Sequence, residues 1–319
     1  MKKCLIIGSG SAGLRHARNA QILGKKVAVV SSRILRDFKT FDCISEAKKE
    51  FNPDFIVIAS ITADHISNLN NLINLDVPVL VEKPLTHKFD DKLLDFVSVI
   101  KKRDIYRCYR VGYLMRYHPM VKQLVRDMPR LGKIYYVHSQ FGQFLPWWRP
   151  KADFKESYSA ELRKGGGVLY DSSHEIDLVQ YLFGETKSVS AFLGNLGVLG
   201  INSDELCSMN MTLKNDIKVN ISLDYLSKIP TRLFRIEGYS GTVIIDFINN
   251  IYSINTDRNN KPKVIDYDFE RNSLFLEELE QFFDKPQDSI LPDLDESIHT
   301  LRIFEAIKKS SEEKRWIKV

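Results

Sequence analysis

Three consecutive glycines at residues 165–167 stand just ahead of Asp171, His174 and Asp177. A carboxylate and an imidazole this close in sequence can act as an acid/base pair, because the imidazole ionises near neutral pH and the carboxylate can orient it. The same side chains could instead bind a metal ion, or could be polar residues at the start of a helix. The pattern therefore has three interpretations.

The metal interpretation is the weakest of the three. Steps of three residues along a helix rotate by about 60° each, so three ligands would spread over about 120° and would meet one ion poorly. Asp171 or Ser172 would cap a helix over about residues 172–183, but a cap explains neither His174 nor the glycines. We therefore expect no metal, and the acid/base interpretation of His174 stays open. The glycines indicate a close approach of the backbone to a ligand or to another chain segment.

Lys83 lies directly after the apolar run at residues 77–81 and Glu82, and before Pro84. If the run is a strand of an open α/β sheet, its carboxyl end is where ligands bind. An ammonium group there can hydrogen-bond a substrate hydroxyl and stabilise the alkoxide that develops as hydride leaves. Pro84 restricts the backbone of Lys83. We predict a catalytic role for Lys83, with Glu82 and Lys83 also close to a cofactor.

The N-terminus carries a nucleotide-binding motif, in which Gly8, Gly10 and Gly13 follow a short apolar run and open a helical pattern. Glycines at this spacing allow a tight turn, close approach of a pyrophosphate to backbone N–H groups, and close packing of the helix on the strand. The N-terminus of the helix also favours phosphate. The motif predicts a dinucleotide site formed by Gly8, Gly10, Ser11, Ala12 and Gly13.

The end of the second apolar run indicates which dinucleotide is bound. An NAD-selective site places Asp or Glu there, to bind the ribose 2′-hydroxyl. This chain has Ser31, Ser32 and Arg33 instead, and hydroxyls beside a guanidinium can bind a 2′-phosphate. We predict NADP as the preferred cofactor, with NAD as the alternative. Three further residues follow the fourth apolar run, where the cofactor is expected to pass: Ser60, Thr62 and His65.

Over the first 112 residues, short apolar runs alternate with helical patterns, which is typical of βαβ units with parallel strands covered on both faces. Strands are expected at residues 4–8, 26–30, 41–44, 55–59, 77–81 and 106–112. After about residue 118, longer strands with polar alternation predict a large, mainly antiparallel open sheet. We therefore predict an α/β protein with an N-terminal Rossmann domain, a doubly wound parallel sheet, at residues 1–118. A substrate-binding α/β domain follows at 119–290, and a helix and tail at 291–319 pack back on the first domain.

Composition and charge exclude several classes of protein. The 319 residues are 44% hydrophobic and 27% charged, which is ordinary for a folded globular chain. The net charge of +5 is mild and no basic run is flanked by aromatics, so a small anionic ligand fits better than nucleic acid. The four cysteines lie far apart, which favours a reducing, cytoplasmic compartment. No stretch approaches the roughly 18–20 apolar residues of a membrane span.

Several motifs in order resemble the Gfo/Idh/MocA family (glucose-fructose oxidoreductase, inositol dehydrogenase and rhizopine-catabolism proteins). They cover nearly the whole chain: the glycine turn, EKP at 82–84, RYHP at 116–119, GGGVLYDSSHEIDLVQYLFG at 165–184, and a closing helix that ends in RWIKV. The resemblance implies NAD(P)-dependent oxidation or reduction of a sugar, cyclitol or nucleotide-sugar carbon. It also implies a homodimer or homotetramer assembled through the open sheet. The stretch at 145–167 resembles members found near bacterial surface-sugar biosynthesis.

In that family the EKP lysine assists proton transfer, and the glycine-rich segment supplies an Asp and, four residues later, a His or Tyr that acts as acid/base. Here His174 follows Asp171 by three residues, and Tyr170 is the residue four before it. The resemblance therefore leaves two partners for His174, with Asp171 preferred and Tyr170 in reserve.

Four other residues are expected to bind substrate. Trp148 and Arg149 offer an aromatic face and a guanidinium for a sugar ring and an anionic group; the other two are Arg116 and Asp177. The function we predict is hydride transfer at a sugar carbon, in which His174 takes the hydroxyl proton and Lys83 stabilises the oxyanion. The alternatives are a non-catalytic NADP-binding sensor of the same fold and a reductase of imines or small carbonyls.

Overall fold

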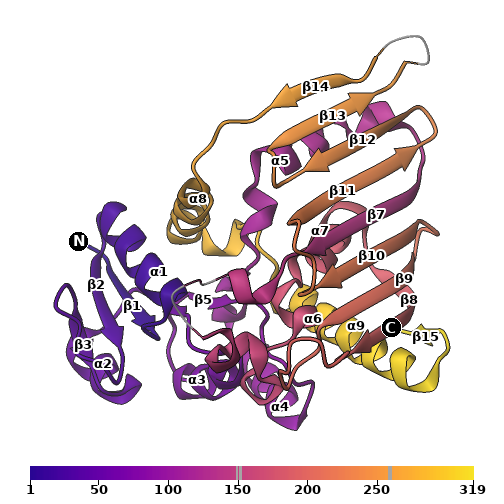
Figure 1. Cartoon of the computed structure of the whole chain (residues 1–319). Coiled ribbons are helices and arrows are strands. Elements are labelled where there is room, and N and C mark those ends of the chain that lie inside the picture. Colours follow the sequence, from indigo (N-terminus) through magenta and orange to yellow (C-terminus); the bar gives the residue numbers. More distant parts are fainter. Residues whose placement is uncertain (149, 151–152, 258–260) are drawn as a thin grey trace. The chain divides into compact units, whose positions relative to one another are not determined.

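The structure, a computed structural model, describes residues 1–148, 150, 153–257 and 261–319 (Figure 1). Its contacts divide the chain into two compact units. Unit 1 comprises Met1–Leu114 and Glu270–Leu301, and unit 2 comprises Met115–Phe269 and Arg302–Val319. Unit 1 contains a six-stranded parallel sheet and unit 2 a nine-stranded, mainly antiparallel sheet, so the predicted α/β fold class is confirmed.

The sheet of unit 1 has the strand order β3-β2-β1-β4-β5-β6, with every neighbour parallel. This is the Rossmann order, and ligands of such sheets bind at the carboxyl ends of the strands, where the order reverses between β1 and β4. The buried residues of β1 and β4 form continuous apolar runs, as strands covered on both faces require. The strands are β1 (Lys3–Ile7), β2 (Lys26–Val30), β3 (Lys39–Phe41), β4 (Phe55–Ile58), β5 (Val79–Glu82) and β6 (Tyr109–Gly112).

Two layers of helices cover this sheet, because right-handed crossovers place helices on opposite faces when the strand order reverses. One layer consists of α1 (Ser11–Ile22) and α8 (Arg271–Asp284), which pack together. The other consists of α2 (Ile44–Phe51), α3 (His65–Leu72) and α4 (Asp91–Ile100).

Helix α8 joins unit 1 although it is far away in sequence. The side-chain amides of Asn19 and Asn272 exchange hydrogen bonds of 3.2 and 3.0 Å, and the ring of His16 meets Phe275 edge-on at 6.0 Å. The sequence analysis assigned this helix to the second domain. An apolar stripe shows that a helix is buried but not against which sheet, so the assignment followed sequence order.

The sheet of unit 2 has the order β14-β13-β12-β11-β7-β10-β9-β8-β15, and only β7 and β10 are parallel neighbours. Along β10, Val219, Ile221 and Leu223 are buried while Asn220 and Ser222 are partly exposed, which is the alternation of a sheet with one covered face. The strands are β7 (Ile134–Gly142), β8 (Thr186–Gly194), β9 (Leu206–Leu213), β10 (Lys218–Asp224), β11 (Thr231–Gly238), β12 (Gly241–Asp246), β13 (Ile251–Asn255), β14 (Lys263–Asp266) and β15 (Ile317–Lys318).

Helices of unit 2 lie on one face of this sheet: α5 (Pro119–Asp127), α6 (Val168–Asp171) and α7 (His174–Phe183) (Figure 1). The other face is crossed by no helix of the unit within the described residues. Four 3₁₀ turns follow β7: η5 (Leu145–Trp147), η6 (Phe154–Glu156), η7 (Tyr158–Ala160) and η8 (Leu162–Lys164). The other 3₁₀ turns are η1 (Thr62–Asp64), η2 (Asp104–Cys108), η3 (Leu114–Tyr117), η4 (Met128–Leu131) and η9 (Pro286–Asp288).

The last helix, α9 (Leu294–Glu313), contains the boundary between the units and contributes residues to both. Asp293 accepts a hydrogen bond from the Glu296 N–H (2.9 Å), and the Glu296 carboxylate accepts one from the Asp293 N–H (3.2 Å). This reciprocal capping box identifies Asp293 as the N-cap. The tail was expected to pack on the first domain, but residues 302–319 belong to unit 2, where β15 pairs with β8.

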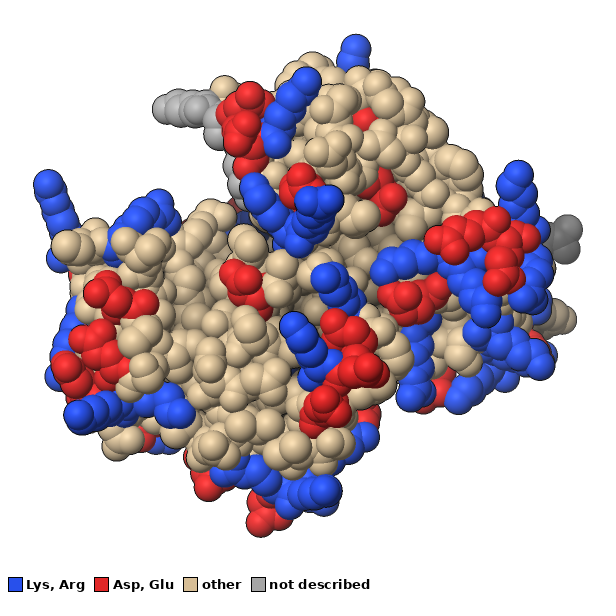
Figure 2. Space-filling model, turned by 90° about the horizontal axis from the view of Figure 1, so that it is seen from below, with Lys and Arg blue, Asp and Glu red and all other residues tan. Residues whose placement is uncertain are grey.

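No described helix is both long and apolar enough to cross a membrane. Figure 2 shows acidic side chains standing among basic ones over the face that it draws, with no continuous field of one sign there.

Candidate active site

The glycine turn connects β1 to α1. A Cβ on Gly8, which has φ +108°, would lie 2.6 Å from the carbonyl oxygen of Ala59, and one on Gly13 would lie 2.1 Å from that of Gly8. The protein's own backbone therefore requires glycine at both positions. A Cβ on Gly10 would meet nothing within 4 Å. The turn is thus open at the N-terminus of α1, beside Ser11 and Ala12, where backbone N–H groups and the helix dipole fit a pyrophosphate.

Ser31, Ser32 and Arg33 follow β2 and surround the turn on one side. The Ser31 hydroxyl lies 2.7 Å from that of Ser9 and accepts a hydrogen bond from the Arg33 N–H at 2.9 Å. The Arg33 guanidinium donates to the carbonyl oxygen of Ser9 (2.5 Å) and to its hydroxyl (3.1 Å). An exposed guanidinium beside hydroxyl groups, with no carboxylate among residues 31–33, fits the 2′-phosphate of NADP.

The candidate cofactor residues after β4 differ in their exposure. His65 is 1% exposed, with Nδ1 3.0 Å from the Pro84 carbonyl oxygen and Nε2 3.2 Å from that of Ser60. Burial lowers the pKa of His65, so the ring is neutral and donates only one of these hydrogen bonds. His65 holds the loop after β4 against the loop after β5, and its expected contact with the cofactor stays a prediction. Thr62 is also buried, and Ser60 is partly exposed.

Glu82 and Lys83 stand at the carboxyl end of β5. The Glu82 carboxylate is 2.7 Å from Nε2 of the buried His16. Burial raises the pKa of Glu82, but the His16 hydrogen bond and the charges of His16 and Lys83 outweigh it and hold the pKa below its usual range. Lys83 is partly exposed, and the Lys83–Pro84 peptide is cis.

Glu278 of α8 is a second carboxyl group close to this strand end. It is fully buried, and neither of its carboxyl oxygens has a hydrogen-bond partner among the described residues. Burial and the charge of Glu82 raise the pKa of Glu278 well above its usual range, so this side chain is a neutral acid.

In unit 2, the glycines at residues 165–167 meet another chain segment. A Cβ on Gly166 would lie 2.0 Å from the Tyr158 carbonyl oxygen, and the Gly167 N–H donates to the Ser159 carbonyl at 3.1 Å. Of the two explanations that the sequence left open, the structure shows a chain segment against these glycines.

The helix that follows the glycines is broken in the middle of the motif. Helix α6 ends at Asp171 and α7 begins at His174, with Ser172 and Ser173 between them. Ser173 is the N-cap residue of α7 and makes no side-chain capping hydrogen bond, so the expected cap by Asp171 or Ser172 is wrong. Because of the break, the three-residue spacing does not correspond to a step along one helix.

Two tyrosines hold the Asp171 carboxylate. The Tyr158 hydroxyl donates to Oδ1 at 2.5 Å, and the Tyr225 hydroxyl donates to Oδ2 at 2.6 Å. Tyr225 is fully buried, and burial together with the Asp171 charge raises its pKa well above the usual range, so its hydroxyl stays protonated as a donor. Trp148 packs edge-on against Tyr225, with ring centroids 5.3 Å apart. Hydrogen bonds from both sides fix the position of the carboxylate.

The structure separates the two candidate partners of His174. Tyr170 is 2% exposed, and its ring meets Phe304 of α9 edge-on at 5.5 Å, with Lys308 Nζ 5.4 Å from its centroid. Asp171 lies instead between the hydroxyl groups of Tyr158 and Tyr225. His174 is the first residue of α7 and is partly exposed. Burial against α9 disfavours Tyr170 as the partner of His174.

Arg116 and Asp177 are paired with each other inside unit 2. The guanidinium donates to both carboxylate oxygens, at 3.0 and 2.8 Å, and the two side chains are 3% and 1% exposed. They form a buried ion pair, and their expected contact with substrate stays a prediction. Trp148 is partly exposed, and Arg149 lies outside the described residues.

Sequence reasoning missed Tyr158, Tyr225, His16 and Glu278. Glu278 left a signal, because it stands within the buried stripe of α8 between Phe275 and Phe282, where a carboxyl group is unusual. The tyrosines left none, since Tyr158 begins the short 3₁₀ turn η7 and Tyr225 follows a strand. Within the described part of the chain, no group of three His, Cys, Asp or Glu side chains could hold a metal ion.

Two family models match the chain. One, described as the NAD-binding Rossmann fold of an oxidoreductase family, matches residues 2–102, and the other, the C-terminal alpha/beta domain of that family, matches residues 122–319. The chain belongs to the Gfo/Idh/MocA oxidoreductase family. Its Rossmann domain is of the NAD(P)-binding type, which the geometry of the glycine turn fits.

Two curated proteins are similar over part of their length. The 2,7-anhydro-N-acetylneuraminate hydratase of Escherichia coli K12 is 25% identical over 175 residues, which are 53% of this chain and 45% of that protein. The rhizopine catabolism protein MocA of Rhizobium meliloti is 25% identical over 194 residues, 56% of each chain. The chain thus spans about half the length of these relatives.

Solved structures resemble the whole chain. Levoglucosan dehydrogenase in complex with NADH has a TM-score of 0.88 at 15% identity, covering 100% of this chain and 99% of that one. GenD2 from gentamicin A biosynthesis in complex with NAD has a TM-score of 0.80 at 19% identity, covering 100% and 97%. At these identities the similarity establishes the fold.

Proposed function

We propose that this protein is an NAD(P)-dependent oxidoreductase that transfers hydride between the nicotinamide and a hydroxyl- or keto-bearing carbon of a sugar, cyclitol or nucleotide sugar. The observation that carries the proposal is the Asp171 carboxylate, held by two tyrosine hydroxyls three residues before a partly exposed histidine. A role in surface-sugar biosynthesis is part of the same proposal.

His174 is the acid/base and Lys83 the electrostatic catalyst in this scheme. In the oxidative direction, His174 accepts the proton of the substrate hydroxyl, and the Asp171 charge stabilises the resulting imidazolium. The Lys83 ammonium stabilises the negative charge that develops on the substrate oxygen. The bound nicotinamide supplies or accepts the hydride.

NADP is proposed as the preferred cofactor. The support is the Arg33 guanidinium, which donates to Ser9 beside the hydroxyl of Ser31. A carboxylate that would bind a ribose 2′-hydroxyl is missing from residues 31–33, which the structure describes in full.

The experiment is a rate measurement on Lys83→Ala, His174→Ala and the double variant, with NADP and a panel of sugars and nucleotide sugars. Each single change should lower kcat by about 10²–10⁴-fold and leave the Kd for NADP within a few-fold. If the two groups serve one step, the double variant should lose far less than the product of the single losses. Lys88→Ala, a change at an exposed lysine, is the control. Catalysis by Lys83→Ala within a few-fold of wild type would contradict the assignment.

The same panel separates the other functions. A stable NADP complex without turnover of any substrate favours a sensor. Turnover of imines or small carbonyls alone favours a reductase of those compounds.

We also propose that a second copy binds the open face of the unit 2 sheet, giving a homodimer or homotetramer. On this face His138, Asn220 and Asn210 form a row joined by hydrogen bonds of 3.0 and 2.9 Å, and Phe192 and Ile244 are 48% and 37% exposed. The exposed Arg235, which pairs with Glu237, lies on the same face between Ile244 and His138. Apolar side chains among polar ones are typical of subunit interfaces. Sedimentation should show an oligomer that Ile244→Asp shifts toward monomer, and a monomeric wild type would refute this.

We propose a cytoplasmic location because the four cysteines form no disulfide. All four are free thiols, and two of them, Cys4 and Cys207, are buried.

A further inference from the structure

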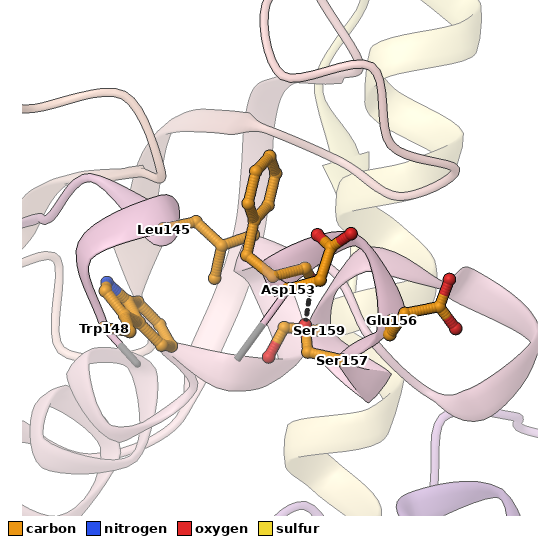
Figure 3. Close-up of a pocket in the computed structure, with 7 residues that line it drawn as sticks. Leu145, Trp148, Asp153, Glu156, Ser157 and Ser159 are labelled. Carbon is orange, nitrogen blue, oxygen red and sulfur yellow. Dashed lines mark hydrogen bonds between the residues drawn. The ribbon is translucent and has the colours of Figure 1, made fainter. Parts of the chain in front are cut away.

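Unit 2 encloses a cavity of about 260 Å³ between the segment after β7 and the 3₁₀ turns η6 and η7. Its buried part is formed by Leu145 and Ser159, and Trp148 and Phe154 are partly exposed. Figure 3 shows Trp148 and Leu145 lying across from Ser157 and Ser159. The cavity therefore has apolar walls on one side and hydroxyl groups on the other.

Two of these side chains are in contact with the residues that hold Asp171. Trp148 packs edge-on against Tyr225, and Ser159 hydrogen-bonds the Tyr225 hydroxyl, which donates to Asp171 Oδ2. Ser157 and Ser159 flank Tyr158, which donates to Oδ1. A molecule in the cavity is thus separated from the Asp171 carboxylate by one layer of side chains.

The size and lining of the cavity restrict its occupant. At about 260 Å³ it is smaller than the roughly 300–1,000 Å³ of sites for drug-sized ligands, so it holds one sugar ring and not a whole nucleotide sugar. A pyranose presents C–H groups on its faces, which suit an aromatic wall, and hydroxyls at its edge, which suit serines.

Charge at the rim restricts the occupant further. The exposed carboxylates of Asp153 and Glu156 also line the cavity. One carboxylate oxygen of Asp153 accepts a hydrogen bond from the backbone N–H of Lys155 at 2.9 Å. Carboxylates at the entrance repel phosphate and carboxylate groups and tolerate hydroxyl or amino groups.

We propose that this cavity binds the sugar ring of the substrate, and that it selects a ring that is uncharged or carries an amino group over one that carries phosphate or carboxylate. The inference rests on the proposed function in taking the substrate to be a sugar. It implies that the diphosphate of a nucleotide-sugar substrate stays outside the cavity.

Binding can be measured without turnover. Of the three tryptophans, Trp147 and Trp316 are half exposed, so Trp147→Phe/Trp316→Phe leaves Trp148 as the sole tryptophan, which can be excited selectively at 295 nm or above, about where tyrosine no longer absorbs. In this background we would titrate glucose, galactose and mannose, then their 2-amino, 6-phosphate and 6-carboxylate derivatives, with NADP present. At least one neutral or amino sugar should change Trp148 fluorescence saturably, with a Kd at least tenfold lower than that of its anionic derivative. Phe154→Ala should weaken that binding about tenfold, and Phe154→Leu less.

Equal binding of the anionic derivatives, no response to any neutral or amino sugar, or binding indifferent to both Phe154 variants would overturn the inference. Its failure is distinguishable from that of the proposed function. Ring binding that depends on Phe154 without turnover of any bound sugar would refute the function alone. Turnover with a KM indifferent to Phe154 and to substrate charge would refute this inference alone.

Discussion

Replacing Asp177 with alanine should destabilise unit 2 and not merely weaken substrate binding. Arg116 and Asp177 are 3% and 1% exposed and share two hydrogen bonds. Losing one partner of a buried ion pair costs about 3–5 kcal/mol, because the other buried charge loses its counter-charge. The Tyr181 ring, 4.6 Å from the Arg116 Cζ, contacts the guanidinium with or without Asp177 and does not change this difference. We therefore expect a loss of about 3–5 kcal/mol.

Urea unfolding followed by tryptophan fluorescence would measure this loss in unit 2, because all three tryptophans, Trp147, Trp148 and Trp316, belong to that unit. The midpoint should fall by about 1 M or more in Asp177→Ala. Asp177→Asn keeps an acceptor without the charge and should lose less.

The double variant Arg116→Met/Asp177→Leu is the matched control for this reasoning. It removes both desolvation costs at once and should recover most of the stability. The structural role is refuted if Asp177→Asn unfolds at the wild-type midpoint while its KM for the sugar rises.

Two further predictions concern the cofactor and pH. Arg33→Ala should raise the KM for NADP about ten- to hundredfold and that for NAD less than threefold in initial-rate assays, since only NADP has the 2′-phosphate; equal losses would exclude that contact. Burial and the charge of Arg232 lower the pKa of His118 to about 3, whereas an unfolded histidine has about 6.5. The unfolded chain therefore binds more protons between these values, and stability falls as pH drops through that window, by about 2 kcal/mol from pH 7 to 5. His118→Asn keeps an acceptor for the Met120 N–H, and in urea unfolding it should abolish the part of the stability loss between pH 7 and 5 that comes from His118. An unchanged pH dependence would show that another group causes this loss.

The strands of unit 1 were predictable from sequence because parallel strands covered on both faces are continuous apolar runs. The expected strand at 26–30 is observed as Lys26–Val30, and that at 55–59 as Phe55–Ile58. The last strand was placed too early, at 106–112, because residues Asp104–Cys108 form a 3₁₀ turn and pairing starts at Tyr109. Local patterning contains no information about that switch from turn to strand.

The candidate site was less predictable because its polar groups are partnered across long sequence distances. Arg116 and Asp177 have the residue types of ligand-binding groups, and only their mutual contact, 61 residues apart, shows that they are an internal pair. His65 also has the residue type of a ligand-binding group, but in the structure its ring nitrogens contact the carbonyl groups of Ser60 and Pro84. A sequence gives the donors and acceptors but not which of them are used within the protein.

The departure from the family's four-residue spacing has a physical explanation in the helix break and the tyrosine pair. If Asp171 had to be oriented by His174, a shift of one residue would disturb both side chains. In this chain Tyr158 and Tyr225 fix the carboxylate from segments outside the motif, and the interval at Ser172 and Ser173 lets α7 begin independently of α6. The position of the Asp171 carboxylate is therefore set without His174. A spacing of three residues is compatible with an acid/base role of the histidine under these conditions, because the tyrosines replace helical periodicity as the element that positions the carboxylate.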